Sequence, residues 1–598
     1  MTHIEFSNWL HFIRLPTINE VILHSFACIT LWLLYYYLFR PLTSPLRWLK
    51  SPPGGRDWTG HYPAMNDYYN GLVVDRWVED LGPTFMVRGL FYVNHRLFTL
   101  DPRAINHIMS QPYLYAKPSI LTRLLKQYMR DGLITAEGHR HKVQRKATQK
   151  LFSSNAMRSM ATVVFEKTDQ LKNIFNDLCI NPALTAPFAR QPLPEASAET
   201  RVIDLYGSTL RLTYDIIGEI AIDHVFDSLN KPRGPGGELF EDYERMQQVV
   251  PGSGGMRQDL GVLIPALDKI WPTEKSRRVD AAMEPLQTLA EAKVAERWKD
   301  IQHERRTDNR DLLTHLLRNT MAKDIPADMK LLDSEITGQL ATFLFAGSET
   351  TAGTIAFGLH HLARNPELQD LLRTECMGYG EGLAFEQMDT LPFLDAVVME
   401  TLRMEPSIPS TIRQTLKDDV IPLATPITLK SGKSVSSIKI RKGQFLTCFE
   451  IHIPIEDLNM APSIWGPDAR TFKPSRWLGT KSNTKPPDQS DPRTTLDSPA
   501  AEPSYPHRGN SPDVPPGGPG IWPNIMTFID GPRRCVGYKL ALMELKITLF
   551  VLVREFVFAP VPGERICKWN LFSTRPFVEG ELRTVGTSLP LLVRPYKA

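Results

Sequence analysis

A cysteine near the C-terminal end of the chain has neighbours that suit a thiolate metal ligand. The pattern is F-x-x-G-x-R-x-C-x-G, with fixed positions Phe528, Gly531, Arg533, Cys535 and Gly537. The glycines allow a tight loop whose amides point at the sulfur, and Arg533 adds positive charge with donors that suit a carboxylate. The apolar run that follows predicts a helix, whose N-terminus favours an anion. The alternative is a buried structural cysteine.

A second cluster places an acid beside hydroxyls within a long predicted helix, residues 334–364. Its members are Ala346, Gly347, Glu349 and Thr350. Glycine and neighbouring threonines lower helix stability, so stability alone does not explain the cluster. A threonine hydroxyl can bend the backbone ladder, and an acid beside a hydroxyl can relay protons. The alternative is a helix crossing at small residues with an ordinary acid.

A third pattern is E-x-x-R, formed by Glu400 and Arg403 on one face of a predicted helix. The residues around it are apolar, which predicts a buried ion pair. Such a pair needs further partners, because desolvating two charges is costly. Arg476, in the segment Phe472-Lys473-Pro474-Ser475-Arg476-Trp477, is the partner that we expect.

These segments, with a basic helix around His141 and Arg145, resemble the cytochrome P450 family, and five motifs occur in the family's order over about residues 80–598. The resemblance implies that Cys535 is the axial ligand of the iron of haem b. A thiolate there favours O–O cleavage. The family usually has a small residue after the phenylalanine of the loop, whereas this chain has Ile529.

The resemblance also assigns roles to the other two patterns. It implies that Glu349 and Thr350 help to deliver protons during oxygen activation, and that Ala346 and Gly347 flank the oxygen pocket. Glu400, Arg403 and Arg476 would form a structural triad, although Ser475 stands where the family often has an acid.

Three residues match the family's haem-propionate contacts. They are Arg413, which follows two prolines, and the pair His141 and Arg145, which resembles W-x-x-x-R with histidine in place of tryptophan. For His141 alone, a solvated basic face is the alternative.

The basic run from Arg140 to Lys150 should lie on the cysteine side of the haem, near Arg534 and Lys539. A positive face there would dock an acidic electron donor. By resemblance to microsomal members, the donor is an NADPH-dependent flavoprotein reductase.

Composition narrows the possible functions. The chain has 598 residues, of which 42% are hydrophobic and 23% charged, and its net charge of +3 does not indicate nucleic-acid binding. Six scattered cysteines without a CxxC pair indicate neither a zinc site nor a disulfide framework.

The N-terminal region predicts a membrane anchor. Residues 21–39 contain no Asp, Glu, Lys or Arg, end in tyrosines, and are followed by Arg40, Arg47 and Lys50. This pattern predicts a single-pass transmembrane helix with a lumenal N-terminus and a catalytic domain that faces the cytosol, in the endoplasmic reticulum membrane. A cleaved signal peptide and a buried core helix are the alternatives.

The chain therefore divides into an anchor (residues 1–40), a Pro/Gly-rich hinge (41–60) and one haem-thiolate monooxygenase domain (61–598). Residues 479–520 contain ten prolines, and we expect a disordered insertion there, either tolerated or used for recognition. The expected fold is mainly α with a smaller β region: strands within residues 84–100, and helices that dominate from Asp101 to about Arg470.

The expected reaction is monooxygenation of a lipophilic small molecule with electrons from NADPH. The expected pocket walls, taken from family position, are residues 113–132, 246–263, 343–345 and 408–412. The anchor, the insertion and the stretch Ile451-His452-Ile453-Pro454 are similar to fungal members. Two alternatives are a haem-thiolate isomerase, dehydratase or peroxygenase that needs no reductase, and a haem-binding protein without turnover.

Overall fold

A computed structural model describes most of the chain. The described residues are 17–55, 59–65, 72–89, 95–152, 154–181, 183–190, 199–230, 239–241, 243–244, 267, 270–303, 311–321, 325–379, 385–442, 450–478, 524–570 and 573–597. The predicted insertion at residues 479–520 and the predicted pocket wall at 246–263 lie outside them.

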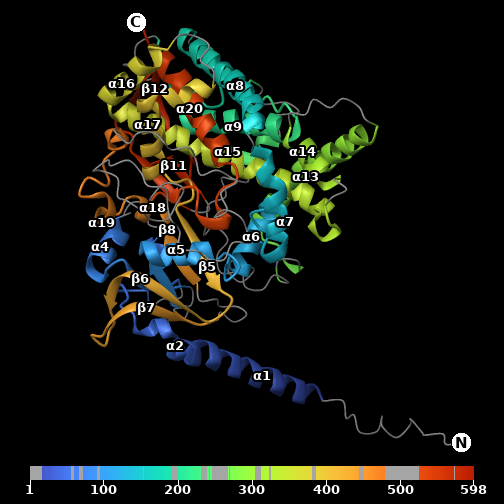
Figure 1. Ribbon diagram of the computed structural model, residues 1–598, viewed down its shortest axis with the longest axis vertical. Coiled ribbons are helices and arrows are strands. Elements are labelled where there is room, and N and C mark those ends of the chain that lie inside the picture. Colours follow the sequence, from blue (N-terminus) through green and yellow to red (C-terminus); the bar gives the residue numbers. More distant parts are fainter. Residues whose placement is uncertain are drawn as a thin grey trace, which may run out of the picture.

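Helices form the larger part of the molecule, and most of the longer ones lie at the end away from α1, while α1, α2 and α4 lie toward the other end (Figure 1). The longer ones are α1 (Ile18–Leu34), α4 (Leu72–Leu81), α5 (Pro102–Ser110), α6 (Ser119–Met129), α7 (Gly138–Gln149), α8 (Ser154–Ile180), α9 (Leu205–Ile222), α13 (Glu274–Gln302), α14 (Leu312–Met321), α15 (Asp333–Arg364), α16 (Pro366–Met377), α17 (Pro392–Met404) and α20 (Tyr538–Glu555). Short helices are α2 (Arg40–Thr43), α3 (Tyr62–Met65), α18 (Ile455–Asn459), α19 (Pro462–Trp465), η3 (Tyr35–Phe39), η4 (Pro45–Trp48), η5 (Lys150–Phe152), η6 (Ala327–Met329), η7 (Phe385–Thr390), η8 (Pro474–Trp477) and η10 (Gly531–Arg533).

The strands form two sheets and two hairpins. A mixed five-stranded sheet has the order β1 (Thr84–Arg88), β2 (His95–Thr99), β8 (Glu450–Pro454), β5 (Ser410–Thr415), β3 (Tyr115–Ala116), with β2 and β8 parallel. The second sheet is β4 (Arg201–Asp204), β12 (Pro590–Pro595), β9 (Phe556–Pro560), and the hairpins are β6 (Asp419–Thr428) with β7 (Ser434–Ile440) and β10 (Ile566–Asn570) with β11 (Thr574–Val578). The mainly helical fold with a smaller β region is therefore confirmed.

Helix α15 runs through the helical core and matches the helix predicted over residues 334–364. Its middle is buried against α9, and two hydroxyls of α9 bond its backbone: Thr209 Oγ1 donates to Ala352 O (3.1 Å) and Thr213 Oγ1 donates to Ser348 O (2.8 Å). Hydroxyls that bridge two helices in this way satisfy their own hydrogen bonds inside the core. This contact holds the cluster at residues 346–350 in the centre of the molecule.

The prediction that helical structure dominates up to about Arg470 is wrong for one stretch. Between Ser410 and Pro454 the chain forms strands β5, β6, β7 and β8. This stretch is rich in valine, isoleucine and threonine, whose branched side chains suit a pleated sheet. The five-stranded sheet and the β6–β7 hairpin lie at the end of the molecule nearest α1 (Figure 1).

The N-terminal segment is helical but not one regular helix. It passes from α1 through the π-helical turn η3 into α2, and large apolar side chains along it are exposed, among them Leu23 and Phe26. Within the described ranges, no single helix combines the length and the hydropathy needed to cross a membrane.

Candidate haem-thiolate site

The loop that carries Cys535 is tight because two of its residues have left-handed backbones. Gly531 has φ +65, and a Cβ there would lie 2.3 Å from the Met109 carbonyl oxygen, so only glycine fits. Ile529 has φ +60, an uncommon conformation for a β-branched residue. The Cys535 N–H donates to Phe528 O (2.8 Å), which closes the loop just before α20 begins. Cys535 thus lies at the head of α20, as the sequence predicts.

The Cys535 sulfur is accessible and electrostatically supported. Among the described cysteines, Cys179, Cys376 and Cys567 are buried, whereas Cys535 is exposed. Burial of the loop raises the pKa of the Cys535 thiol, and the Gly537 N–H, together with Arg145 and Arg534, acts in the opposite direction. Burial dominates, so the three groups offset only part of the rise in the thiol pKa, and a metal cation bound at the sulfur would favour the thiolate.

Buried cations gather beside this loop from three different elements and from the connection between β3 and α6. Lys117, Arg145, Arg413 and Arg533 all lie close enough to Cys535 or to one another to perturb the pKa values of the group. Burial, with Arg533 nearby, lowers the pKa of Lys117 to about 7, and burial lowers the pKa of Arg413 to about 10. Burial and the Arg534 charge lower the pKa of Arg145 to about 10.

Among the described residues, one carboxylate, that of Glu137, is close to Lys117, Arg413 and Arg533. Glu137 accepts from Arg533 Nη2 and lies 3.5 Å from Lys117 Nζ, while Arg533 Nη1 donates to Ala136 O (2.9 Å). Like charges buried together are costly unless an anion compensates them. The four cations outnumber this carboxylate, so they suit a bound group that carries two carboxylates of its own. The exposed Cys535 beside them suits a group that also carries a metal with an open coordination position. The residues present therefore fit haem.

His141 is buried and neutral, so the alternative in which it lies on a solvated basic face is wrong. It is 2% exposed, and burial, with Arg533 and Lys117 nearby, lowers its pKa to about 2. Its Nδ1 lies 3.4 Å from the Tyr113 hydroxyl. Arg145, one turn further along α7, is also buried and donates to the Arg534 carbonyl. These contacts place α7 against the cysteine loop.

Glu349, the acid of the second cluster, has hydrogen-bond partners from a distant segment. Glu349 is 2% exposed, and its Oε1 accepts hydrogen bonds from Arg575 Nε and Ser573 Oγ at the start of β11. The Thr350 hydroxyl donates to Ala346 O (2.7 Å), one helical turn back. The two contacts of Glu349 do not follow from the local motif, because Ser573 and Arg575 lie more than 220 residues further along the chain.

Gly347 lies at a helix crossing. A Cβ there would meet Ile217 Cγ1 of α9 at 2.8 Å, so close packing of α15 on α9 requires a residue without a side chain. Its neighbour Ala346 is partly exposed. The structure therefore supports the alternative of a helix crossing at a small residue for Gly347. That Gly347 and Ala346 flank an oxygen pocket stays a prediction.

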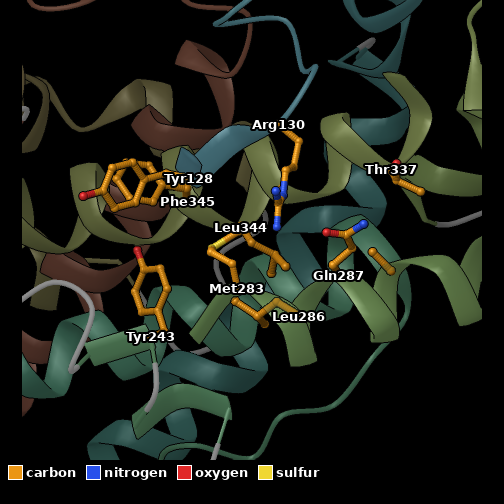
Figure 2. Close-up of a pocket in the computed structure, with 11 residues that line it drawn as sticks. Tyr128, Arg130, Tyr243, Met283, Leu286, Gln287, Thr337, Leu344 and Phe345 are labelled. Atoms are coloured by element: carbon orange, nitrogen blue, oxygen red, sulfur yellow. The ribbon is translucent and has the colours of Figure 1, made fainter. Parts of the chain in front are cut away.

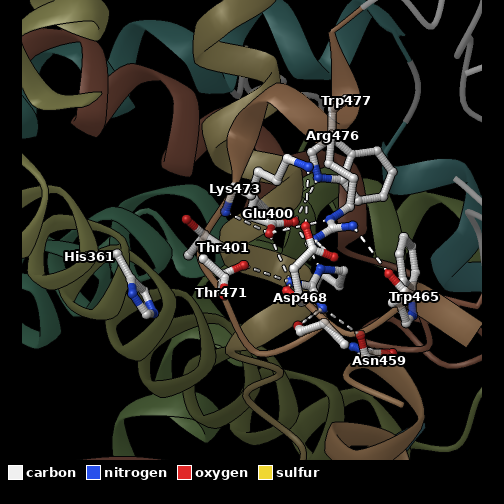
Figure 3. A network of polar contacts seen from close by, with 12 residues as sticks. His361, Glu400, Thr401, Asn459, Trp465, Asp468, Thr471, Lys473, Arg476 and Trp477 are labelled. Atoms are coloured by element: carbon white, nitrogen blue, oxygen red, sulfur yellow. Dashed lines mark hydrogen bonds and ion pairs between the residues drawn. The ribbon is translucent and has the colours of Figure 1, made fainter. Parts of the chain in front are cut away.

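The structural triad is assembled as expected (Figure 3). Glu400 and Arg403 are fully buried and form a bidentate pair, with two N–O distances of 2.8 Å. Arg476 Nε lies 3.8 Å from Glu400 Oε1. Further donors to Glu400 are the Lys473 N–H and Trp477 Nε1, each at 2.9 Å.

Other contacts complete the network of Figure 3. Arg403 Nη1 donates to Asn459 O (2.9 Å) and Ala469 O (2.6 Å), and Arg476 Nη2 lies 3.2 Å from Asp468 Oδ1. Asp468 supplies a carboxylate partner for Arg476, while Ser475 occupies the position where the family often has an acid. The network joins α17 to η8 and to the segment between them.

An apolar pocket lies between α6, α13 and α15 (Figure 2). Its walls include Tyr128, Met283, Leu286, Leu344 and Phe345. The volume of about 30 Å³ has room for a water molecule or two. Two predicted walls, residues 113–132 and 343–345, contribute to it, whereas residues 408–412 do not.

The basic run has fewer exposed charges than expected. Lys146 and Lys150 of the run are exposed, but Arg140 is paired with Glu335 and Arg534 is buried. Since it is buried, Arg534 is not part of an exposed docking face. Its guanidinium lies over the Tyr538 ring, 5.5 Å from the centroid.

Sequence reasoning missed several residues at the site. Lys117, Arg575 and Asp468 belong to none of the motifs. Lys117 and Arg575 act through partners distant in sequence, whereas Asp468 pairs with Arg476, eight residues away. The signal for Lys117 was its position within the predicted pocket wall at residues 113–132.

Comparison with known proteins agrees with this geometry. The family model described as cytochrome P450 matches residues 72–492 and 522–576. The chain belongs to the cytochrome P450 family. The resemblance inferred from the motifs is therefore confirmed.

The similar proteins are fungal and span nearly the whole chain. "Cytochrome P450 monooxygenase 205" of Postia placenta is 33% identical over 95% of this chain and 96% of its own length. "Cytochrome P450 monooxygenase 128" of the same fungus is 33% identical over 94% of each chain. "Cytochrome P450 monooxygenase claO" of Ampulloclitocybe clavipes is 30% identical over 88% of each chain. These comparisons support a cytochrome P450 monooxygenase, an enzyme of a haem-iron family.

Proposed function

We propose that this cytochrome P450 binds haem b through Cys535 and inserts one atom of dioxygen into a lipophilic small molecule, with electrons from NADPH delivered by a flavoprotein reductase. The observation that carries the proposal is the accessible Cys535 sulfur, which has the Gly537 N–H as a donor and lies beside an excess of buried cations. When bound, haem supplies the oxygen-activating redox chemistry. The chain's own residues hold it and control access.

Each group of residues has a separate task in this proposal. Lys117, Arg145 and Arg413 would hold the propionates, with His141 as an additional donor. Glu349 and Thr350 would hold and pass protons within the core. The pocket in Figure 2 is lined mainly by aromatic and aliphatic side chains, as suits a lipophilic group, but its volume of about 30 Å³ is far below that of a ligand site.

The first test is the absorption difference spectrum of the dithionite-reduced, carbon-monoxide-bound protein. We expect a strongly red-shifted Soret band in the wild type, loss of that band in Cys535→Ser, and an unchanged band in Cys28→Ser, which alters the other exposed cysteine among the described residues. An ordinary haem–CO band in the wild type would contradict thiolate ligation.

Electron delivery is proposed to use the exposed lysines of α7 and the segment after it. Lys146 and Lys150 are exposed, and α7 contacts the cysteine loop through Arg145. Reversing both lysines to glutamate should slow reduction by the reductase about tenfold at low ionic strength, with no change in haem content. Lys299→Glu, an exposed position on α13, is the matched control. Equal reduction rates in all variants, measured by stopped flow, would exclude this docking face.

The N-terminal segment is proposed to anchor the enzyme in the endoplasmic reticulum membrane, with the catalytic domain in the cytosol. Its support is the uncharged run at residues 21–39, the exposed apolar side chains of α1, and the basic residues that follow.

A further inference from the structure

The carboxyl group of Glu349 is held by one oxygen only. Its Oε1 accepts from Arg575 Nε and Ser573 Oγ, while its Oε2 is buried and has no hydrogen-bond partner within the described residues. The Glu349 and Arg575 side chains are 1% and 4% exposed. A buried polar atom without a partner is costly, and it is retained where it takes part in function.

Arg575 places a cation beside the buried Glu349 carboxyl group. Burial opposes the charged form of Arg575, yet the Glu349 carboxylate raises its pKa above the ordinary value. The groups that also face the pair are phenols, namely Tyr206 on α9, Tyr128 on α6, and Tyr243. A buried carboxylate is costly unless a cation or hydrogen-bond donors face it, and the cation here is Arg575.

The start of β11 holds both members of the acid–hydroxyl pair. Between Ser573 and Arg575, the Thr574 N–H donates to Ser407 O (2.8 Å). The Ser407 hydroxyl in turn donates to the Thr350 carbonyl oxygen (2.6 Å). One three-residue segment therefore contacts Glu349 directly and Thr350 through Ser407.

The position of Arg575 is itself defined by the hairpin. Arg575 pairs across the ladder with Trp569 of β10, and its guanidinium carbon lies 5.5 Å from the centroid of the Trp569 ring. A planar guanidinium packed on an aromatic face has few other orientations. This packing directs Nε at Glu349 and leaves the second carboxylate oxygen free.

We propose that Arg575 is a positioning residue for proton delivery, which holds the Glu349 carboxyl group in place through Oε1 and leaves Oε2 available for proton exchange. Ser573 supports the same oxygen. The proposal rests on the proposed role of Glu349, and it adds the residue on β11 that makes this role possible.

Infrared difference spectra of the substrate-free, haem-loaded protein test the ion pair without any turnover. Arg575→Gln minus wild type should show a new protonated-carboxyl band, and the double variant Glu349→Gln/Arg575→Gln should lack it. Arg575→Lys should show no band, because it restores a cation. Arg211→Gln, which removes another buried arginine, is the control.

Glu544 is another buried carboxyl group, and burial raises its pKa well above the ordinary value. Its infrared band is the same in all variants and therefore cancels in the difference spectra. If Arg575→Gln fails to fold, wild type minus Glu349→Gln decides the question. A protonated-carboxyl band in that spectrum would overturn the proposal.

Oxygen reduction tests whether Arg575 acts through Glu349. With the reductase-reconstituted enzyme and no added substrate, Glu349→Gln and Arg575→Gln should each lower NADPH oxidation by about tenfold or more. Arg575→Lys should recover most of the rate. In the double variant the loss should equal that of Glu349→Gln alone, since the effects of residues that act as a unit do not add.

Two results would count against the proposal, and they differ in meaning. A further fall in the double variant would show that Arg575 does not act through Glu349. An unchanged rate in Glu349→Gln would remove the proposed role of Glu349, and with it that of Arg575, while the infrared result for the ion pair would stand.

Discussion

Ile529 shows how one residue can depart from the family pattern and keep the loop. It follows Phe528, where the family usually has a small residue, and its φ of +60 lies in the left-handed region. That conformation costs about 1–2 kcal/mol for a residue with a branched side chain. The side chain packs against the apolar cluster around β1 and β2, which offsets part of this cost.

Gly531 is the position in this loop with the least tolerance. Gly531→Ala should lower the free energy of unfolding of the haem-loaded protein by about 3 kcal/mol or more and should reduce haem content. The added Cβ would clash with the Met109 carbonyl oxygen, and alanine would also be strained at the positive φ of this position. Gly432→Ala is the matched control. It has φ +82 with open space, so it should cost only about 1 kcal/mol. Equal losses in urea unfolding would show that the contact with Met109 is unimportant.

At the scale of elements, the Glu400 network joins α17 to η8 through buried charges. Arg476 is 2% exposed, whereas the neighbouring Lys473 side chain is 41% exposed and pairs with the same Asp468. Burial decides the energetic difference between the two pairs, since water screens the exposed one.

Replacing Arg476 should therefore be far more harmful than replacing Lys473. Arg476→Met should lower the free energy of unfolding by about 3 kcal/mol, because it leaves part of the charge of Glu400 uncompensated. Lys473→Met should cost less than about 1 kcal/mol, because its backbone N–H still donates to Glu400. Urea unfolding with a measurement of haem content checks both. A similar loss in the two variants would contradict the structural role of Arg476.

At the scale of the whole molecule, α1 extends away from the body and exposes its apolar side chains (Figure 1). Exposed apolar surface of this extent requires a covering phase or partner. The β6–β7 hairpin lies near the same end, where Lys430 Nζ donates to Arg47 O (2.8 Å). This end of the molecule is the one that we propose faces the membrane.

Deleting residues 1–40 should move the protein from the membrane pellet to the supernatant in cell fractionation, with the carbon-monoxide spectrum unchanged. The spectrum serves as the control for folding. Retention of the truncated protein in the pellet would contradict a simple anchor and would require a second membrane contact from the body.

The sequence by itself predicted the features that depend on short spacings. The cysteine loop, the E-x-x-R pair and the long helix with Glu349 each lie within one segment, and helical periodicity carries their geometry. Among the strands missed between Ser410 and Pro454, β8 and β5 pair with β2 and β3, which lie some 300 residues or more away, whereas β6 and β7 pair with each other as a hairpin. The roles of His141 and Arg145 followed from the family resemblance, but their burial did not.

Tertiary structure alone decided which charges meet. Arg575 reaches Glu349 across 226 residues, and Lys117 lies near Arg413 of β5 and Arg533 of the cysteine loop. Such contacts depend on how elements pack, and no local pattern encodes them. The physical reason is that a buried charge must find a partner wherever the fold supplies one, because its desolvation cost is the same whatever the separation along the chain.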